Sequence, residues 1–251
     1  MKIDFDGRVA LITGGSRGIG RATALLLAEH GAHVALNYRQ NDAAAAALVE
    51  ELKRYPVQAK AYRADVADEH AVKTMVDQVA ADFGRLDILV NNAGIWKEAS
   101  IATITSEELS EMIDINMKSM FYCARAAVPY LTRQGGAIVN ISSTAGQRGE
   151  AYHSHYASTK GAMIAFTKSL ATELVNERIR VNCVAPGWVA TDMSQATLDS
   201  ANGEKAMREI PMRRPARPEE IAGAVVFMAS DWASFVTGEV LNVNGGAVLC
   251  G

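Results

Sequence analysis

Residues 8–20 read RVALITGGSRGIG, and this stretch decides the fold. Its first six residues form a short run suited to a β-strand, and Gly18 to His30 follow with the apolar spacing of a helix that stops at Gly31. Glycines between a strand and a helix let the chain turn tightly, so that backbone N–H groups meet a phosphate at the helix N-terminus. The stretch therefore predicts a strand, a nucleotide-phosphate loop and a helix.

The loop glycines have the spacing Gly14-x-x-x-Gly18-x-Gly20, not the G-x-G-x-x-G of many dinucleotide-binding folds. A plain tight turn also explains a glycine triplet, but a strand before it and a helix after it favour the phosphate loop. The contacts expected from this loop come from Gly14, Ser16, Arg17, Gly18, Ile19 and Gly20.

Strand-like and helix-like segments alternate along the rest of the chain. This alternation predicts an α/β fold, doubly wound, in which a mainly parallel sheet carries helices on both faces. Neither a linker nor an internal repeat divides the chain, so residues 1–251 are expected to form a single domain. The expected strands are 8–13, 32–38, 57–62, 87–91, 136–142, 179–185 and 240–243, and the expected helices are 18–30, 42–54, 68–83, 105–131 (with a bend or break near Pro129), 156–176 and 218–230.

One long irregular stretch runs from about residue 189 to residue 217 and is rich in polar residues and proline. Segments of this length without regular structure are more often functional than not. We interpret it as a lid over the substrate that contains short helices; the alternative is a mobile surface insertion.

The composition excludes several classes of protein. The net charge of −3 argues against nucleic acid or an anionic membrane as the main partner. The chain has neither a signal-peptide pattern nor an apolar run of membrane-spanning length. Its three cysteines lack metal or redox spacing, which favours a reducing cytoplasm and predicts no metal site.

The second predicted strand indicates which cofactor binds. An NAD site usually places an acid about 20 residues past the glycines, on the ribose hydroxyls. Residues 37–41 contain no acid there, whereas Arg39 follows the strand and Arg17 lies in the glycine loop. Two guanidinium groups suit a 2′-phosphate, so the sequence predicts NADP(H). The alternative is that either arginine is a solvated surface charge.

Two further segments follow strands where a dinucleotide would lie. Asp65-Val66 follows the third strand, and Asp65 suits either the adenine amino group or a helix N-cap. Asn92-Ala93-Gly94 follows the fourth strand, where small residues let the backbone approach a ribose; an ordinary turn is the alternative.

Tyr156 and Lys160 are four residues apart and share one face of a predicted helix. Reduction of a ketone requires a proton at the oxygen, and a tyrosine can supply it. An ammonium about 4 Å away contributes roughly 4 kcal/mol at intermediate dielectric, which predicts a Tyr156 pKa lowered by roughly three units. Ser143 is expected to polarise the carbonyl oxygen, with Ser142 as its rival. Asn116 is unusual inside an apolar helix unless it holds water or backbone.

These motifs together resemble the short-chain dehydrogenase/reductase family along essentially the full chain. The matching segments are TGGSRGIG, NNAG, Asn116, Ser143, YASTK and Pro186-Gly187. The resemblance implies a Rossmann-type sheet of about seven strands and a catalytic tetrad of Asn116, Ser143, Tyr156 and Lys160, with Asn116 holding a relay water. It also implies that Lys160 and Tyr156 contact the cofactor, that Pro186, Gly187 and Val189 lie near its nicotinamide, and that the enzyme is a homotetramer.

Within that family the chain is most similar to bacterial 3-oxoacyl-[acyl-carrier-protein] reductases, which implies a place in fatty acid biosynthesis and a carrier protein as partner. Where basic residues would meet the carrier, this chain has Gln134 and Glu177, although Arg133 and Arg178 are adjacent. Trp96, Trp188 and His153 are candidate residues of the substrate pocket, and wall packing is the alternative for the tryptophans.

The sequence therefore predicts an NADPH-dependent carbonyl reductase that acts on a small-molecule carbonyl or acyl thioester. The first alternative is an alcohol or sugar dehydrogenase of the same family. The second is a protein that senses NADP(H) without chemistry, which the presence of all four tetrad residues disfavours.

Overall fold

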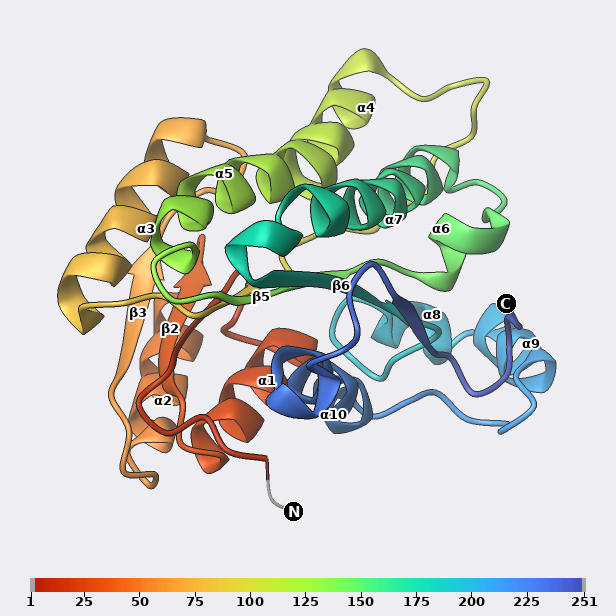
Figure 1. The fold of residues 1–251 in the computed structure, drawn as a ribbon. Coiled ribbons are helices and arrows are strands. Elements are labelled where there is room, and N and C mark those ends of the chain that lie inside the picture. Colours follow the sequence, from red (N-terminus) through yellow and green to blue (C-terminus); the bar gives the residue numbers. More distant parts are fainter. Residues whose placement is uncertain (1–2, 250–251) are drawn as a thin grey trace.

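The structure is a computed structural model that describes residues 3–249, and its centre is a seven-stranded parallel sheet (Figure 1). The strand order is β3-β2-β1-β4-β5-β6-β7, so the chain reverses direction across the sheet between β1 and β4. The predicted doubly wound α/β fold is confirmed. The strands are β1 (Val9–Ile12), β2 (His33–Tyr38), β3 (Ala59–Arg63), β4 (Ile88–Asn91), β5 (Gly136–Ile141), β6 (Ile179–Pro186) and β7 (Val240–Val243).

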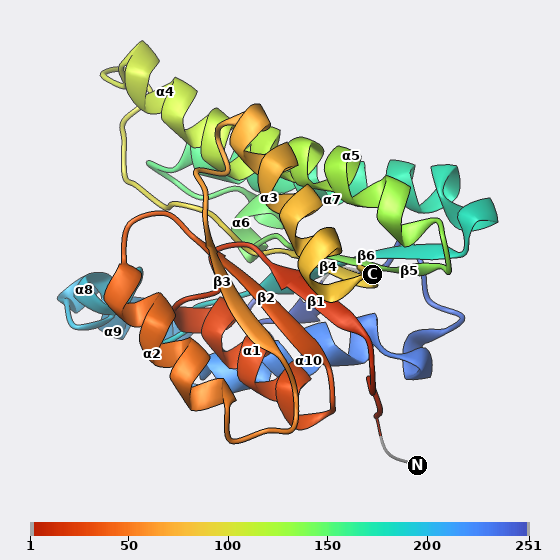
Figure 2. The ribbon, with the colours of Figure 1, turned by 90° about the vertical axis from the view of Figure 1, so that its left-hand side faces the viewer.

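Helices form a layer on each face of the sheet. In Figures 1 and 2 one layer contains α1, α2 and α10, and the other contains α3, α5 and α7. The α-helices are α1 (Gly18–Glu29), α2 (Asp42–Leu52), α3 (Glu69–Phe83), α4 (Ser106–Ile113), α5 (Ser119–Leu131), α6 (Thr144–Arg148), α7 (Ser154–Glu173), α8 (Gln195–Leu198), α9 (Ala201–Glu209) and α10 (Pro218–Ala229). Three short segments complete the order: π-helical η1 (Asp114–Lys118) and the 3₁₀ turns η2 (Val175–Glu177) and η3 (Asp231–Ala233).

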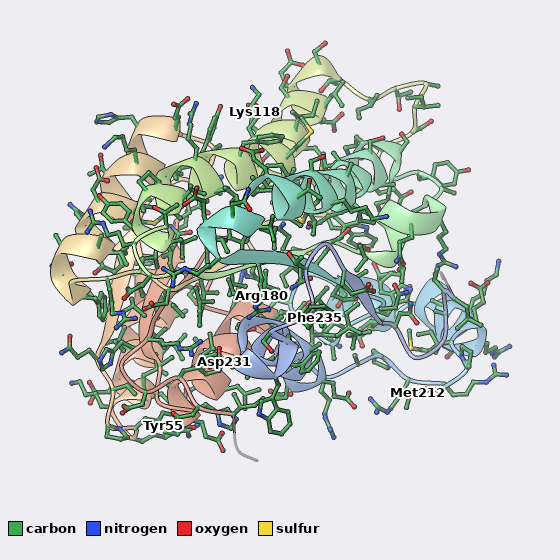
Figure 3. The ribbon with its side chains drawn as sticks, viewed as in Figure 1. Tyr55, Lys118, Arg180, Met212, Asp231 and Phe235 are labelled. Carbon is green, nitrogen blue, oxygen red and sulfur yellow. The ribbon has the colours of Figure 1, made fainter. Side chains whose placement is uncertain are left out.

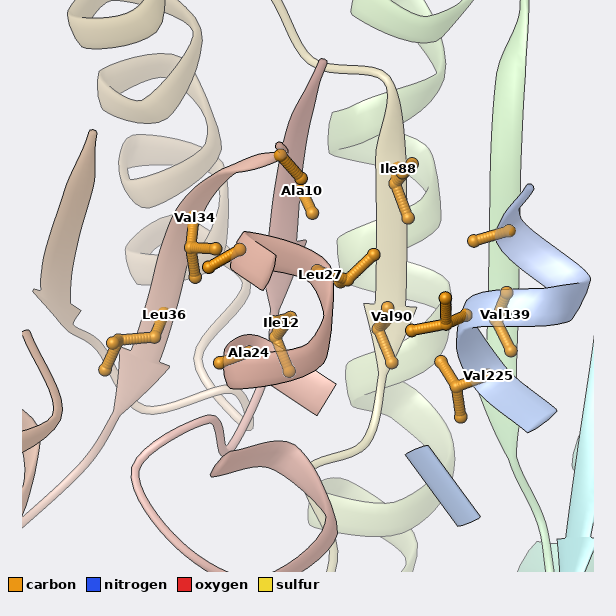
Figure 4. Close-up of a cluster of buried hydrophobic side chains, with 14 of the residues drawn as sticks. Ala10, Ile12, Ala24, Leu27, Val34, Leu36, Ile88, Val90, Val139 and Val225 are labelled. Atoms are coloured by element: carbon orange, nitrogen blue, oxygen red, sulfur yellow. The ribbon is translucent and has the colours of Figure 1, made fainter. Parts of the chain in front are cut away.

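The sheet separates two hydrophobic cores, because alternate strand residues point to opposite faces. Ala10 and Ile12 belong to the core beneath α1 and α10 (Figure 4), whereas Val9 and Leu11 belong to the core beneath α3 and α5. All four residues of β1 are buried, as expected for a strand covered by helices on both sides.

The expected bend near Pro129 is not observed, because α5 continues through this residue to Leu131. Pro129 lies only two residues before the helix ends, so its ring affects the last turn and does not divide the helix. The irregular backbone lies upstream instead, in the π-helical segment η1 that contains Asn116.

Arg180 on β6 ties the end of α10 to the sheet (Figure 3). Its guanidinium donates hydrogen bonds to the backbone oxygens of Met228, Ala229 and Ser230 at 2.7, 3.1 and 3.0 Å. These carbonyls belong to the end of a helix, where intrahelical partners are missing. Burial lowers the pKa of Arg180, with nearby Asp231 acting in the opposite direction.

The variant Arg180→Met is therefore expected to lower the free energy of unfolding by about 2 kcal/mol, because it leaves partly buried carbonyls without a charged donor. Urea unfolding followed by circular dichroism measures this change. Lys168→Met, at an exposed position of α7, is the control and should match the wild type. An Arg180→Met protein as stable as that control would contradict the role of Arg180.

Candidate active site

A cavity of about 680 Å³ opens at the carboxyl ends of the central strands. Open α/β sheets bind their ligands at this edge, where the strand order reverses. Residues from the glycine loop, from the ends of β2 to β6 and from the segment after β6 line it. Of the site residues expected from the sequence, the cavity is lined by Gly14, Ser16, Arg17, Gly18, Ile19, Arg39, Asp65, Val66, Asn92, Ala93, Gly94, Trp96, Ser143, Tyr156, Lys160, Pro186, Gly187, Trp188 and Val189.

Three expected site residues do not line the cavity: Gly20, Asn116 and His153. Each lies directly behind a residue that does. A Cβ atom on Gly20 would lie 2.5 Å from the Gly14 oxygen, Asn116 hydrogen bonds with Ile95, and His153 stacks on Trp96. These three residues support the wall of the site and do not form its surface.

The glycine loop is built for close approach of a ligand. Gly14 and Gly18 have φ values of +60° and +54°, a conformation that side chains rarely tolerate. Arg17 is the N-cap of α1 and its side chain does not cap the helix, which leaves the first backbone N–H groups directed towards the cavity end of α1. This loop fits the diphosphate of a dinucleotide.

Asn37 stabilises the glycine loop through hydrogen bonds of its side chain and was not predicted from the sequence. Its Oδ1 accepts from the Gly14 backbone N–H at 3.2 Å, and its Nδ2 donates to the Ala64 oxygen at 3.0 Å. Asn37 is buried within the otherwise apolar strand β2. An amide inside an apolar strand is the signal that could have revealed it.

At the β2 end of the cavity, two arginines face two aspartates. Nη1 of Arg39 lies 3.6 Å from Oδ2 of Asp65, and Nη1 of Arg17 lies 4.0 Å from Oδ2 of Asp192. Both pairs are solvent-exposed, so each contributes little to stability and leaves the guanidinium groups accessible. The N-cap of α3 is Asp68, which excludes the N-cap alternative for Asp65.

At the other end of the cavity, the side chain of Ser143 lies next to that of Tyr156, where it favours the ionised phenol and so acts to lower the Tyr156 pKa. Ser143 is the N-cap of α6, and its Oγ also accepts from the backbone N–H of Ala145 at 3.1 Å. Ser142 is turned away, because its buried hydroxyl donates to the Lys160 backbone oxygen at 2.8 Å. The geometry therefore favours Ser143 over Ser142 as the serine that faces a ligand.

Lys160 lies one turn after Tyr156 on α7, with its Nζ 5.7 Å from the centre of the tyrosine ring. The ammonium donates a hydrogen bond to the Ile141 backbone oxygen at 2.8 Å. Lys160 is buried, and this burial lowers its pKa to about 8, which keeps it mostly cationic at neutral pH.

The pKa of Tyr156 differs from the expected lowering. Burial raises it to about 12, and the neighbouring Ser143 side chain opposes this shift only in part. The side chain is partly exposed to the cavity but otherwise surrounded by protein, and the Lys160 ammonium is directed to the Ile141 oxygen instead of the phenol. The phenol is therefore protonated at neutral pH and available as a proton donor.

Asn116 uses its buried amide to fix the backbone of Ile95. Its Oδ1 accepts from the Ile95 N–H at 2.8 Å and its Nδ2 donates to the Ile95 oxygen at 2.9 Å. The same Nδ2 lies 3.4 Å from Oγ1 of Thr159, which donates to the Tyr156 backbone oxygen at 2.7 Å. Asn116 thus connects the β4 loop to the helix of Tyr156, and the relay water remains a prediction.

An aromatic group forms the wall near Tyr156. The rings of Trp96 and His153 are stacked, with centres 4.5 Å apart and an interplanar angle of 1°. Trp188 meets Trp96 edge-on at 5.7 Å. The two tryptophans line the cavity, and Trp96 separates the buried His153 from it.

The stretch from 189 to 217 contains the short helices α8 and α9. Its two ends are joined by a bridge between Val189 and Ala216, and the Ser194 hydroxyl donates to the Val189 oxygen. Thr191, Asp192, Met193 and Ser194 line the cavity, so the first part of this stretch borders the site.

Among residues 3–249, His, Cys, Asp and Glu side chains form no group of three or more that could hold a metal ion. In the same part of the chain, each helix is too short or too polar to cross a membrane.

Comparison with known proteins identifies the family to which this chain belongs. It belongs to the short-chain dehydrogenase/reductase family, and residues 14–248 match the family model described as "Enoyl-(Acyl carrier protein) reductase". The chain is accordingly an oxidoreductase that acts on CH–OH or C=O groups with a nicotinamide cofactor.

Curated relatives from several bacteria carry the name "3-oxoacyl-[acyl-carrier-protein] reductase FabG". The protein of Staphylococcus aureus (strain N315) is 44% identical over 238 residues, which cover 94% of this chain and 96% of the relative. That of Thermotoga maritima is 39% identical over 246 residues, covering 98% and 99%. The family model and these relatives name different reductions, of an enoyl group and of a 3-oxo group.

Solved structures agree with the fold. A dehydrogenase/reductase from Sinorhizobium meliloti 1021 has a TM-score of 0.94 at 37% identity and covers 98% of this chain, with 97% of its own chain matched. A short-chain dehydrogenase from Burkholderia cenocepacia J2315, in complex with NADP, has a TM-score of 0.93 at 36% identity, with 96% and 98% covered.

Proposed function

We propose that this enzyme uses NADPH to reduce the 3-oxo group of acyl thioesters, with acyl carrier protein as the physiological carrier. The observation that carries the proposal is that Tyr156 and Ser143 line the same cavity as the glycine loop. The names of the relatives from Staphylococcus aureus and Thermotoga maritima support the substrate class.

The residues present fit a dinucleotide. The positive φ values of the loop glycines, the free N-terminus of α1 and the length of the cavity from Arg39 to Trp188 match a phosphate site at one end and a reaction site at the other. When bound, NADPH supplies the hydride. Gly14, Gly18 and Ile19 would hold its phosphates, Asp65 and Val66 its adenine, and Asn92, Gly94 and Lys160 its ribose.

The remaining chemistry belongs to side chains of this protein. Ser143 donates a hydrogen bond to the carbonyl oxygen and orients it. Tyr156, protonated at neutral pH, gives its proton to the same oxygen as negative charge develops there. Lys160, cationic in its buried position, would hold the ribose of the cofactor. Asn116 fixes the backbone of Ile95 and reaches α7 through Thr159.

The preference for NADPH rests on Arg39 and Arg17. Arg39→Asp is expected to lower the ratio of kcat/KM for NADPH to that for NADH at least about tenfold, because a carboxylate replaces a charge-assisted donor to the 2′-phosphate. Steady-state kinetics with both cofactors measure this ratio. Arg133→Asp is the control, because Arg133 lies before β5, at the amino ends of the strands and away from the cavity; this variant should leave the ratio unchanged. An equal ratio in Arg39→Asp and wild type would remove Arg39 from the phosphate site.

A substrate panel tests the reaction itself. NADPH oxidation is followed with acetoacetyl thioester, crotonyl thioester, diketones, keto-sugars and quinones. Preference for acetoacetyl thioester is expected; preference for crotonyl thioester would instead support the enoyl reduction in the description of the family model. Activity confined to sugars or alcohols would support the dehydrogenase alternative, and cofactor binding without any turnover would support a sensor.

A tetramer is the proposed assembly, built through α5, α7 and the C-terminal segment. Large apolar side chains are exposed on or beside these elements: Phe121 on α5, Val175 just after α7, and Trp232 and Phe235 before β7. Phe235 is labelled in Figure 3. Covering such side chains is favourable. Sedimentation equilibrium should give four 26.9-kDa chains, and a monomer would contradict this proposal. A cytoplasmic location is proposed because Cys123 and Cys183 are buried free thiols.

Arg133 and Arg178 precede β5 and β6, whereas the cavity lies at the far ends of these strands. A carrier protein that contacts these arginines on one subunit therefore does not face the cavity of that same subunit. For this reason, the substrate panel uses small thioesters, which test the chemistry without the carrier.

A further inference from the structure

Glu150 differs from the other acidic residues that line the cavity. Asp65 and Asp192 each lie within 4.0 Å of an arginine. Across residues 3–249, Glu150 has no ion pair with lysine or arginine, although its side chain is only 27% exposed. A partly buried carboxylate without a cationic partner is costly unless it finds hydrogen-bond donors.

The contacts of Glu150 hold it in one place and leave much of its acceptor capacity free. Its Oε2 accepts from Nε1 of Trp96 at a long 3.4 Å, and its Oε1 lies 3.9 Å from Nδ1 of His153, beyond hydrogen-bond distance. Nδ1 of His153 is 3.0 Å from the Ala151 oxygen instead. Since a carboxylate offers about four acceptor positions, most of them remain open on the cavity side.

The backbone around Glu150 is also fixed. Tyr152, two residues later, has a φ of +62°, and its backbone oxygen accepts from the Ala99 N–H at 2.8 Å. A strained conformation of this kind persists only where neighbouring structure imposes it. The carboxylate is therefore presented by a defined loop and not by a free surface chain.

Glu150 acts at the chemical end of the cavity. Glu150 lines the same cavity as Ser143 and Tyr156, and it lies in the short connection between α6 and α7. Trp96, which donates a hydrogen bond to Glu150, lines this cavity as well. The charge of Glu150 also acts to raise the pKa of Tyr156, for which burial is the main cause. A ligand whose carbonyl oxygen meets Ser143 and Tyr156 thus shares the cavity with the Glu150 carboxylate.

We propose that Glu150 forms a second polar subsite that accepts a hydrogen bond from a hydroxyl group next to the reacting carbonyl, so that the enzyme also reduces hydroxy ketones. The carbonyl carbon gains a hydride from NADPH, the oxygen gains the Tyr156 proton, and the product is a diol with NADP⁺. Glu150 itself neither gains nor loses a proton. This activity goes beyond thioester reduction and uses the same Ser143 and Tyr156.

The test compares 1-hydroxy-2-butanone with 2-butanone in the wild type, Glu150→Ala and Glu150→Gln. The hydroxyl also activates the carbonyl chemically, so the decisive quantity is the change in the ratio of the two kcat/KM values. Loss of a hydrogen bond to a charged acceptor should lower this ratio at least about tenfold in Glu150→Ala. The ratio for Glu150→Gln should lie between those of Glu150→Ala and the wild type. Glu173→Ala, an exposed carboxylate at the far end of α7, is the matched control.

A binding measurement separates recognition from turnover. Calorimetry with 1,2-butanediol and 2-butanol, in the presence of NADPH, forms complexes that cannot react. The wild type should bind 1,2-butanediol more tightly than 2-butanol, and Glu150→Ala should remove this difference between the two ligands. Circular dichroism confirms that each variant is folded, and Glu150→Gln preserves the shape if Glu150→Ala does not fold.

A ratio unchanged in both variants would overturn the proposal, as would equal binding of diol and alcohol to the wild type or the absence of turnover with both ketones. The rate with acetoacetyl thioester is measured on the same samples. Inactivity with the thioester alone would contradict the proposed function and leave the Glu150 subsite standing.

Discussion

Tyr156→Phe is expected to lower kcat for carbonyl reduction about 10³-fold or more, the upper range for loss of a positioned proton donor. The phenol is protonated at neutral pH because burial raises its pKa to about 12, and Tyr156 lines the same cavity as Ser143. Phenylalanine keeps the ring against Lys160 and removes only the hydroxyl. Stopped-flow or steady-state NADPH oxidation measures the effect.

The dissociation constant of NADPH, measured by fluorescence, should stay within about twofold of the wild type in the same variant, because Tyr156 contributes chemistry more than affinity. Tyr55→Phe is the control, since Tyr55 (labelled in Figure 3) lies after α2 and does not line the cavity, and its hydroxyl accepts a hydrogen bond from Arg54. Turnover near the wild-type rate in Tyr156→Phe would exclude this residue as the donor.

Gly20→Ala is expected to weaken NADPH binding about 100-fold or more and to lower the melting temperature. An added Cβ would lie 2.5 Å from the Gly14 oxygen, 2.6 Å from Asn92 Nδ2 and 2.9 Å from Gly15 Cα. Two of these atoms are backbone of the phosphate loop, so the loop itself must shift, and misplacement of about 1 Å can cost about 100-fold. Fluorescence titration and thermal unfolding measure both effects.

Gly223→Ala gives a matched control on α10. A Cβ there would meet nothing within 4 Å, and alanine favours a helix by about 1 kcal/mol over glycine. This variant should bind NADPH normally and melt at the same or a higher temperature. If Gly20→Ala behaved like Gly223→Ala, the close packing of the phosphate loop would not control cofactor binding.

Periodic patterns in the sequence predicted most of this fold. The run Val9–Ile12 and the helical spacing after Gly18 predicted β1 and α1 because strands and helices repeat their apolar residues at different intervals. Motif spacing predicted the glycine loop and the pair Tyr156 and Lys160. Both are local patterns, because each motif lies within one element or the turn before it.

The features that were not predicted depend on contacts between distant segments. The hydrogen bond from Gly14 to Asn37 joins the glycine loop to strand β2, 23 residues further along the chain. The Tyr156 pKa depends on how deeply α7 is packed and on the Lys160 ammonium bonding to Ile141, which a helix-face argument does not contain. The bend predicted near Pro129 is wrong, because a proline this close to the end of a helix disrupts few of its hydrogen bonds.

The bridge between Val189 and Ala216 brings together two points 27 residues apart, at the rim of the cavity. The segment between them also contacts the rest of the protein, because the Met212 N–H donates to the Gly245 oxygen at 3.2 Å and Asp192 lies 4.0 Å from Arg17. The glycine turn, Ser143 and Tyr156 lie on other elements. We therefore expect substitutions in the part of this segment that lines the cavity to change which molecules bind, while Ser143 and Tyr156, which lie on other elements, keep the chemistry of carbonyl reduction.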